Sequence, residues 1–172
     1  NNLMDNLMQN IFNKSYDKDG SIANRGIPNL KLIKSFCDDP FLKKPPPKSL
    51  DRSEMMNNEF YQKILNLKPV DAMATLSLLT AETIKTNFQF LPFKPKTVII
   101  VGGGQHNKTL IENIKKSLKL KIYLSDEIGL LGDFIEAELI GFLTARKFYN
   151  LPSTFNSTTG SITDVINGSI ID

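Results

Sequence analysis

Hydrophobic residues recur at helical spacing in the first part of the chain. Within residues 1–12 the apolar positions are Leu3, Met4, Leu7, Met8, Ile11 and Phe12. Their period near 3.6 predicts an amphipathic helix that ends near Asn13. A second, shorter helix is predicted from the apolar positions Ile27, Leu30, Ile33 and Phe36. We expect Asp38-Asp39-Pro40 to stop it, because proline disfavours helical backbone in the residue before it.

The middle of the chain changes from a helical pattern to a strand pattern. Pro69 suits the first turn of a helix whose apolar side carries Met73, Leu76, Leu79, Thr83 or Ile84, and Phe88. Residues 97–101 (TVIIV) are wholly apolar and β-branched, which is typical of a strand covered on both faces. Three glycines follow directly, and residues 121–125 (KIYLS) read as the next strand.

Between these strands the sequence predicts a helix. Asn107 can cap it, and its apolar positions are Leu110, Ile111, Ile114 and Leu118. The whole segment is therefore a strand, glycine turn, helix, strand unit. A long helix then runs through Phe134, Ile135, Leu139, Phe142, Ala145 and Tyr149. A Ser/Thr/Asn loop and a final helical or irregular segment (163–170) follow Pro152.

Two other segments are predicted to be irregular. Residues 16–21 (YDKDGS) are rich in turn formers. Residues 43–53 (KKPPPKSLDRS) contain three successive prolines, which remove three backbone donors and exclude a regular helix or a central strand. We treat 43–58 as a Pro-rich loop within one domain that spans residues 1–172.

The glycine turn after the first strand is the sharpest candidate for a binding site. Glycines at the carboxyl end of a parallel strand let a ligand approach the backbone, while the next helix offers free N–H donors. A nucleotide could sit at Gly102, Gly103, Gly104 and Asn107. A tight turn that binds nothing explains the same residues equally well. The dinucleotide fingerprint and the P-loop pattern are both absent from VGGGQHN (101–107).

Four carboxylates follow the second strand, where ligands of open α/β sheets collect. Asp126, Glu127, Asp133 and Glu136 could hold Mg²⁺ through water or accept hydrogen bonds from sugar hydroxyls. Asp133 and Glu136 also have the spacing of a capping box, so that capping the long helix is the alternative. Both roles can coexist.

Composition and charge narrow the classes of partner. The 21 basic and 18 acidic residues give a net charge of +3, and the positive residues are scattered, which does not favour nucleic acid as a partner. No apolar stretch is long enough for a membrane span. The single cysteine, Cys37, is interpreted as a residue that packs on a helix face. Because it cannot form a disulfide within the chain, a reducing compartment such as the cytoplasm is favoured. The single histidine, His106, is interpreted as a loop residue near the nucleotide.

Six blocks in order carry a resemblance to a known family. They are YDKDG (16–20), PPKSLDR (46–52), ATLSLLTA (74–81), VGGGQHN (101–107), SDEIGLLGDFIEAE (125–138) and LPSTFNSTTGS (151–161). Together they resemble anhydro-N-acetylmuramic acid kinases over nearly the whole chain. The resemblance implies an α/β fold, the C-terminal lobe of an actin-like (ribonuclease H-like) ATPase. The predicted elements are mostly helices with only two strands, so that several sheet strands are missing from the chain or are supplied by a partner. The resemblance also implies ATP and Mg²⁺, an amino-sugar substrate and a homodimer.

The resemblance assigns roles to individual residues. Gly102, Gly103, Gly104 and Asn107 fall on the family's adenosine-contacting turn, and Glu136 falls on an acidic residue that contacts the amino sugar. The family commonly has Lys-Ser-Thr-Gly-Arg-Glu where this chain has Lys48 to Ser53, so the role of that loop is open. The general-base Asp of the family is expected upstream of Asn1, together with an N-terminal lobe. No catalytic residue is therefore assigned within the chain.

Three hypotheses follow from the sequence. In the first, the chain is the C-terminal lobe of the kinase and works with an N-terminal lobe in cis or in trans. This fits the missing initiator Met, the start inside a helical pattern, and a two-stranded sheet whose edges lack partners. In the second, it is a non-catalytic remnant of a split or decayed kinase gene with residual nucleotide binding. The third is an independent Rossmann-like module, which a preference for NAD over ADP and ATP would reveal.

Overall fold

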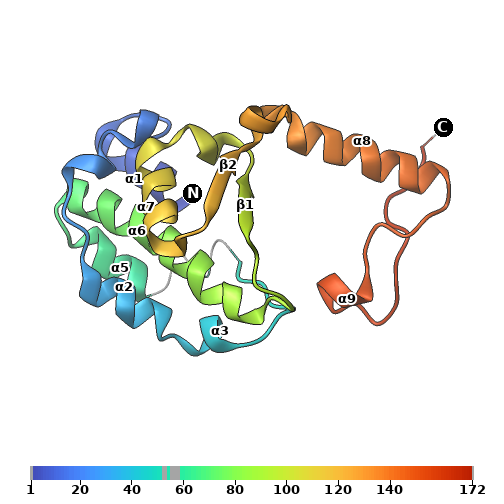
Figure 1. Ribbon diagram of the computed structural model, residues 1–172, viewed down its shortest axis with the longest axis horizontal. Helices are drawn as coiled ribbons and strands as arrows, with labels where there is room; N and C mark the ends of the chain where they lie inside the picture. The colour runs from blue at the N-terminus through green and yellow to red at the C-terminus, as the bar shows by residue number, and fades with distance from the viewer. Residues whose placement is uncertain (1, 52–53, 55–58, 172) are drawn as a thin grey trace.

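The structure is a computed structural model that describes residues 2–51, 54 and 59–171. Its α-helices are α1 (Asn2–Phe12), α2 (Leu30–Cys37), α3 (Pro40–Lys43), α5 (Glu59–Leu65), α6 (Pro69–Asn87), α7 (Lys108–Leu118), α8 (Ile135–Phe148) and α9 (Asn156–Thr159). Its strands are β1 (Thr97–Ile100) and β2 (Lys121–Leu124). Short 3₁₀ turns are η1 (Lys18–Gly20), η2 (Ala23–Arg25), η3 (Phe88–Phe90), η4 (Gly103–His106), η5 (Ser125–Ile128) and η6 (Gly132–Phe134). The chain is thus a helix-rich mixed α/β protein (Figure 1).

Helix α6 lies at the centre of the body (Figure 1). Pro69 occupies its first turn, as predicted, and the predicted positions Met73, Leu76 and Leu79 are buried. Other faces of the helix are buried as well, and the residues there are small: Ala72, Ala74, Ser77 and Ala81. Because small side chains allow close approach, α1, α2, α5 and α7 all pack against this one helix. The main hydrophobic core therefore forms around α6.

The two N-terminal helices form largely as their periodicity predicts. Helix α1 buries Met4, Leu7 and Met8 and ends at Phe12, after which Asn13 adopts a left-handed conformation (φ 53°) that ends the helix. Helix α2 buries Ile33 and Phe36 and ends before Asp38. The predicted inclusion of Ile27 in this helix is wrong.

Ile27 lies before the helix and is 78% exposed. Pro28 restricts the backbone of Ile27, and Asn29 starts the helix by accepting a hydrogen bond from the N–H of Leu32 at 3.1 Å. Helix α2 stops at Asp38-Asp39-Pro40 as predicted. Asp39 then caps the short helix α3, which the hydrophobic pattern did not indicate. Helix α5 was also not predicted.

The predicted Pro-rich loop, 43–58, is described in part. Lys43 belongs to α3, residues 44–51 have no regular structure, and residues 52–53 and 55–58 lie outside the described residues. Lys48 has a structural role here. Its Nζ donates to the carbonyl oxygens of Phe41 and Leu42 at 3.2 and 2.8 Å and lies 4.7 Å from the ring centroid of Phe90. These contacts fix the loop against the end of α3.

The strand, glycine turn, helix, strand unit is confirmed. Strands β1 and β2 pair in parallel, with Thr97 opposite Lys121 and Ile100 opposite Leu124. Helix α7 lies between the sheet and α6, in a cluster of Ala81, Leu110 and Ile114 with Ile100 and Ile122 at its edge. The predicted burial of β1 on both faces is wrong for the residues described. Val98 and Ile100 alternate with Thr97 and Ile99, and Ile99 is 49% exposed on the face that lacks a helix.

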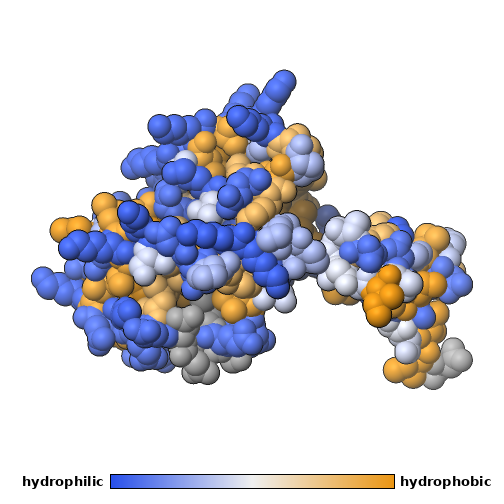
Figure 2. Space-filling view, turned by 90° about the horizontal axis from the view of Figure 1, so that it is seen from below, coloured by the Kyte–Doolittle hydropathy of each residue, from blue (hydrophilic) through white to orange (hydrophobic). Residues whose placement is uncertain are grey.

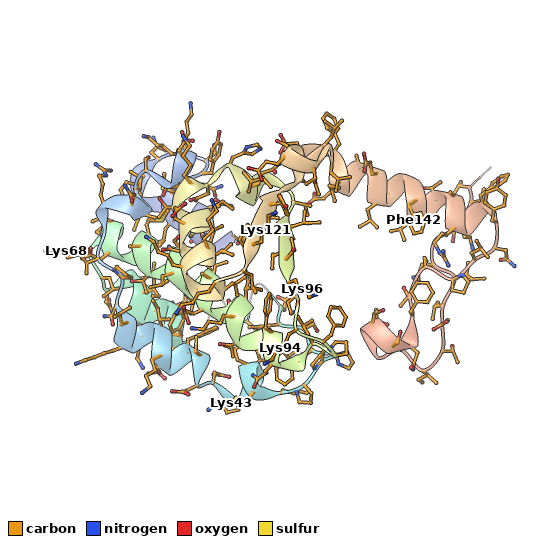
Figure 3. The ribbon with its side chains drawn as sticks, in the orientation of Figure 1. Lys43, Lys68, Lys94, Lys96, Lys121 and Phe142 are labelled. Atoms are coloured by element: carbon orange, nitrogen blue, oxygen red, sulfur yellow. The ribbon has the colours of Figure 1, made fainter. Side chains whose placement is uncertain are left out.

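Helix α8 extends away from the body and carries the C-terminal segment with α9 (Figure 1). The predicted long helix is confirmed, but none of its described residues is buried. Phe142, labelled in Figure 3, is 57% exposed, and Figure 2 shows hydrophobic surface on this arm. Beyond α8, Thr154 and Val165 form an isolated antiparallel bridge, and the final segment is irregular. Among the described residues, no helix is long and apolar enough to cross a membrane.

Candidate functional site

The glycine turn at the carboxyl end of β1 presents open backbone. Gly102 has φ 76°, and Gly103 starts η4. A Cβ added at Gly102 or at Gly103 would meet no atom within 4 Å, whereas one at Gly104 would lie 3.8 Å from Leu110. Asn107 caps α7 as predicted, since its Oδ1 accepts from the N–H of Leu110 at 2.9 Å. The first two glycines therefore leave space above the backbone for a ligand.

The turn at residues 16–20 packs directly against the start of α7. The hydroxyl of Thr109 donates to the carbonyl oxygen of Gly20 at 2.7 Å, and Lys108 pairs with Asp19 at 3.3 Å. Gly20 has φ 71°, and an added Cβ would collide with Asn107 Oδ1 and lie 2.6 Å from Thr109 Oγ1. Only glycine fits this approach. In Figure 1 the N-terminal segment, in blue, lies beside α7.

These two turns and α1 enclose a cavity of about 500 Å³. Its lining residues are Met4, Asp5, Tyr16, Asp17, Lys18, Asp19, Gly103, Gly104, His106, Asn107 and Leu110. The volume lies in the range of small-molecule sites. Of the predicted nucleotide-binding residues, Gly103, Gly104 and Asn107 line the cavity and Gly102 immediately precedes them. Glu136, the predicted sugar contact, does not line it and is exposed on the first turn of α8.

The polar lining of the cavity is largely acidic. Asp17 is 5% exposed, and its carboxylate accepts from the N–H groups of Ile22 and Ala23 at 2.8 and 2.9 Å. Asp19 is paired with Lys108, while Asp5 lines the α1 side. Carboxylates accept hydrogen bonds, so this wall suits a ligand that brings O–H or N–H donors, such as the ribose and base of a nucleoside.

His106 joins the cavity to the start of α8. Its Nε2 lies 2.9 Å from Oδ1 of Asp133, and both side chains are more than half exposed. The hydrogen bond to Asp133 raises the pKa of His106 above its usual value of 6.5. Burial opposes this rise, and the charges of Asp133, Asp126 and Asp19 add to it. The interpretation of His106 as a loop residue agrees with its position in η4.

The predicted capping box of Asp133 and Glu136 is wrong. Helix α8 begins at Ile135, its N-cap residue is Phe134, and no side-chain hydrogen bond caps it. The carboxylate of Asp133 pairs with His106 instead, a residue 27 positions earlier in the chain. The carboxylate of Asp133 thus forms a tertiary contact rather than the helix cap that its local spacing predicted.

The four predicted carboxylates do not converge on one point. Asp126 accepts from the N–H of Gly132 at 3.2 Å, and Glu127 accepts from the N–H of Leu124 at 2.9 Å. Across the residues that the structure describes, no group of three or more His, Cys, Asp or Glu side chains is arranged to hold a metal ion. Asp126 and Glu127 therefore stabilise the loop after β2.

A buried polar network links the ends of the two strands, and sequence reasoning missed it. Ser125, fully buried, donates to the amide oxygen of Gln105 at 2.8 Å, and the Gln105 amide nitrogen donates to Asp126 at 3.4 Å. Gly132 is buried against Gln105 and Ser125 and has no room for a Cβ. Gln105 follows the three glycines directly, but nothing in its local pattern indicates burial or a partner 20 residues away.

The His106–Asp133 pair gives a first testable prediction. Because His106 is the only histidine, the NMR signals of its two ring C–H protons need no further assignment. We expect an apparent pKa above 6.5 in the native chain and a lower value in Asp133→Asn. Glu138→Gln, which removes an exposed charge elsewhere on α8, should leave the pKa almost unchanged. An identical His106 titration in Asp133→Asn would contradict the contact.

The same pair sets a pH dependence of stability. The pKa of His106 is higher in the folded chain than in the unfolded one, so the folded state binds the proton more tightly. The stabilisation is present in full below about pH 6.5 and is lost as the pH rises through the raised pKa. The pair is exposed, so that high salt should weaken the effect.

Comparison of the sequence with known proteins identifies the family of the chain. The family model for anhydro-N-acetylmuramic acid kinase matches residues 1–172. Curated relatives of that name include proteins from Zymomonas mobilis subsp. mobilis (34% identical, 93% of this chain), Hydrogenovibrio crunogenus (32%, 99%) and Nitrobacter winogradskyi (35%, 93%). The matches cover 43%, 47% and 43% of those relatives, so the chain spans less than half of their length. The match over the whole chain places it in the anhydro-N-acetylmuramic acid kinase family.

Proposed function

We propose that this chain supplies the nucleotide-binding wall of an ATP-dependent kinase of cell-wall recycling. The kinase transfers the γ-phosphate of ATP to O6 of 1,6-anhydro-N-acetylmuramic acid while water adds to C1 and opens the anhydro ring, which gives N-acetylmuramic acid 6-phosphate and ADP. The observation that carries the proposal is the cavity beside the glycine turn, which Gly103 and Gly104 line and where the backbone of Gly103 has open space above it. The name of the family supports a kinase that acts on this anhydro sugar. In this proposal residues 1–172 are the C-terminal lobe of an actin-like (ribonuclease H-like) ATPase fold.

In the proposed arrangement, adenosine lies against Gly102, Gly103, Gly104 and Asn107, and Glu136 contacts the amino sugar. The acidic wall of the cavity accepts hydrogen bonds from the nucleoside. Mg²⁺ would be held by the phosphates and water rather than by a carboxylate cluster of this chain, because the described carboxylates are not arranged for one. The metal would offset the negative charge of the phosphates.

The remaining catalytic groups are proposed to come from an N-terminal lobe, in cis or in trans. Phosphoryl transfer requires charge stabilisation around the γ-phosphate and a group that orients the attacking oxygen. No residue of the cavity is assigned as the general base, and we propose that an Asp outside these 172 residues serves. The reaction would take place in the cytoplasm, where ATP is available, and the assembled enzyme would be a homodimer.

A complementation assay tests this function. The chain is mixed with the N-terminal half of the Hydrogenovibrio crunogenus relative, with ATP, Mg²⁺ and the anhydro sugar, and the product is followed by mass spectrometry. We expect the 6-phosphate in the mixture and none with either part alone. ADP binding by calorimetry, without phosphorylation in any mixture, would instead favour a non-catalytic remnant. Preference for NAD over ADP would overturn the kinase proposal and indicate an independent Rossmann-like module.

A further inference from the structure

His106 is the cavity residue whose chemistry changes most near neutral pH. It lies in η4, between the open glycines and Asn107, and it lines the cavity. Asp133 occupies its Nε2 at 2.9 Å. Among the described residues, none forms a hydrogen bond with the other ring nitrogen, Nδ1. One nitrogen of the ring is therefore fixed and the other remains available to a ligand.

The charged residues that line the cavity indicate which ligand group this nitrogen could contact. The wall carries Asp5, Asp17 and Asp19, and its basic residues are Lys18 and His106. A nucleotide that extends phosphates from this acidic cavity needs cationic donors near the glycine turn. Both side chains are exposed, but Lys18 lies on the opposite turn, whereas His106 lies on the glycine turn itself.

The tautomer imposed by Asp133 makes the contact depend on protonation. When Nε2–H donates to Asp133, the neutral ring has only a lone pair at Nδ1, which repels a phosphate oxygen. The protonated ring has a second N–H at Nδ1 and a positive charge. The acidic groups that face the ring are Asp133 on η6, Asp126 on η5 and Asp19 on η1, and Lys108 on α7 partly offsets Asp19.

We propose that His106, held by Asp133, is a positioning residue whose Nδ1–H contacts the phosphates of the bound nucleotide, so that ADP affinity falls as His106 loses its proton. This inference rests on the proposed nucleotide-binding function. Through Asp133, the contact would link nucleotide binding to the loop that precedes α8.

The test is calorimetric titration of ADP and of adenosine between pH 5.5 and 8.5. It compares the native chain with His106→Gln, Asp133→Asn and the control Glu138→Gln. For the native chain and Glu138→Gln we expect ADP affinity to fall by about tenfold across this range beyond the change seen in His106→Gln, the size of one charge-assisted hydrogen bond. The titration of the ADP phosphate itself is common to all variants and cancels in this comparison.

Asp133→Asn should move the midpoint of the pH dependence to lower pH, and adenosine affinity should be equal in all four proteins. Equal pH dependence of ADP binding in the native chain and His106→Gln would overturn the inference and leave the proposed function intact. An equal loss of adenosine affinity in His106→Gln would overturn the phosphate contact. Failure of the native chain to bind ADP at any pH would overturn both the inference and the proposed nucleotide site.

Discussion

Replacement of Gly20 by alanine is expected to lower the free energy of unfolding by about 3 kcal/mol and to abolish nucleotide binding in the cavity. Gly20 has φ 71°, where an alanine costs about 1–2 kcal/mol. The new Cβ also collides with the Asn107 side chain that caps α7, and loss of such a cap costs about 1 kcal/mol. Moving the turn at 16–20 away from Thr109 would open one wall of the cavity. Chemical denaturation and ADP calorimetry measure the two effects.

Gly129→Ala is the matched control for this substitution. Gly129 has φ 78°, but a Cβ there would meet no atom within 4 Å. It therefore reports the backbone strain alone, and we expect a loss of about 1–2 kcal/mol with ADP binding retained. Equal stability losses in Gly20→Ala and Gly129→Ala would show that the close approach of the 16–20 turn to α7 does not contribute.

Gly103→Ala is expected to weaken ADP binding by about tenfold or more while the fold keeps its stability. A Cβ at Gly103 meets no protein atom within 4 Å, and the residue does not need a positive φ. The methyl group would instead occupy space in the cavity that a ligand fills, at a cost of about 1–3 kcal/mol in binding. Calorimetric titration and thermal melting of the same sample separate the two quantities.

Gly141→Ala provides the comparison, since Gly141 lies within α8 and a Cβ there also meets nothing within 4 Å. Alanine in place of a helical glycine should stabilise α8 by about 1 kcal/mol and leave ADP affinity unchanged. Unchanged ADP affinity in Gly103→Ala would mean that the nucleotide does not lie over the glycine turn. The cavity would then need another ligand.

Local patterns predicted the elements whose signals are contained within a few turns of chain. The spacing of Met4, Leu7 and Met8 predicted α1, and the sequence from the apolar strand through Asn107 predicted the β1, α7, β2 unit, because each reflects a short-range requirement for burial or capping. A glycine turn after a strand is also a local feature, and three of the four residues predicted to bind nucleotide, Gly103, Gly104 and Asn107, line the cavity.

The errors arise where distant residues decide the outcome. Asp133 has the spacing of a helix cap, yet its carboxylate is taken by His106, which no local rule connects to it. The second wall of the cavity, at residues 16–20, was recognised as a turn but not as part of a site, because its position depends on the packing of Gly20 against α7. Similarly, the apolar composition of β1 predicted cover on both faces, whereas the described residues cover only one.

The side-chain amide of Gln105 couples the position of the glycine turn to that of the loop after β2. Ser125 and Asp126 engage both ends of that amide, so that a shift of the glycine turn must either break a buried hydrogen bond, at about 1–3 kcal/mol, or carry the loop after β2 with it. That loop is the base of α8, whose 14 residues extend about 21 Å. A displacement of a fraction of an ångström at the glycine turn would therefore move the far end of α8 by a larger distance, and Glu136 in the first turn of α8 would move with it.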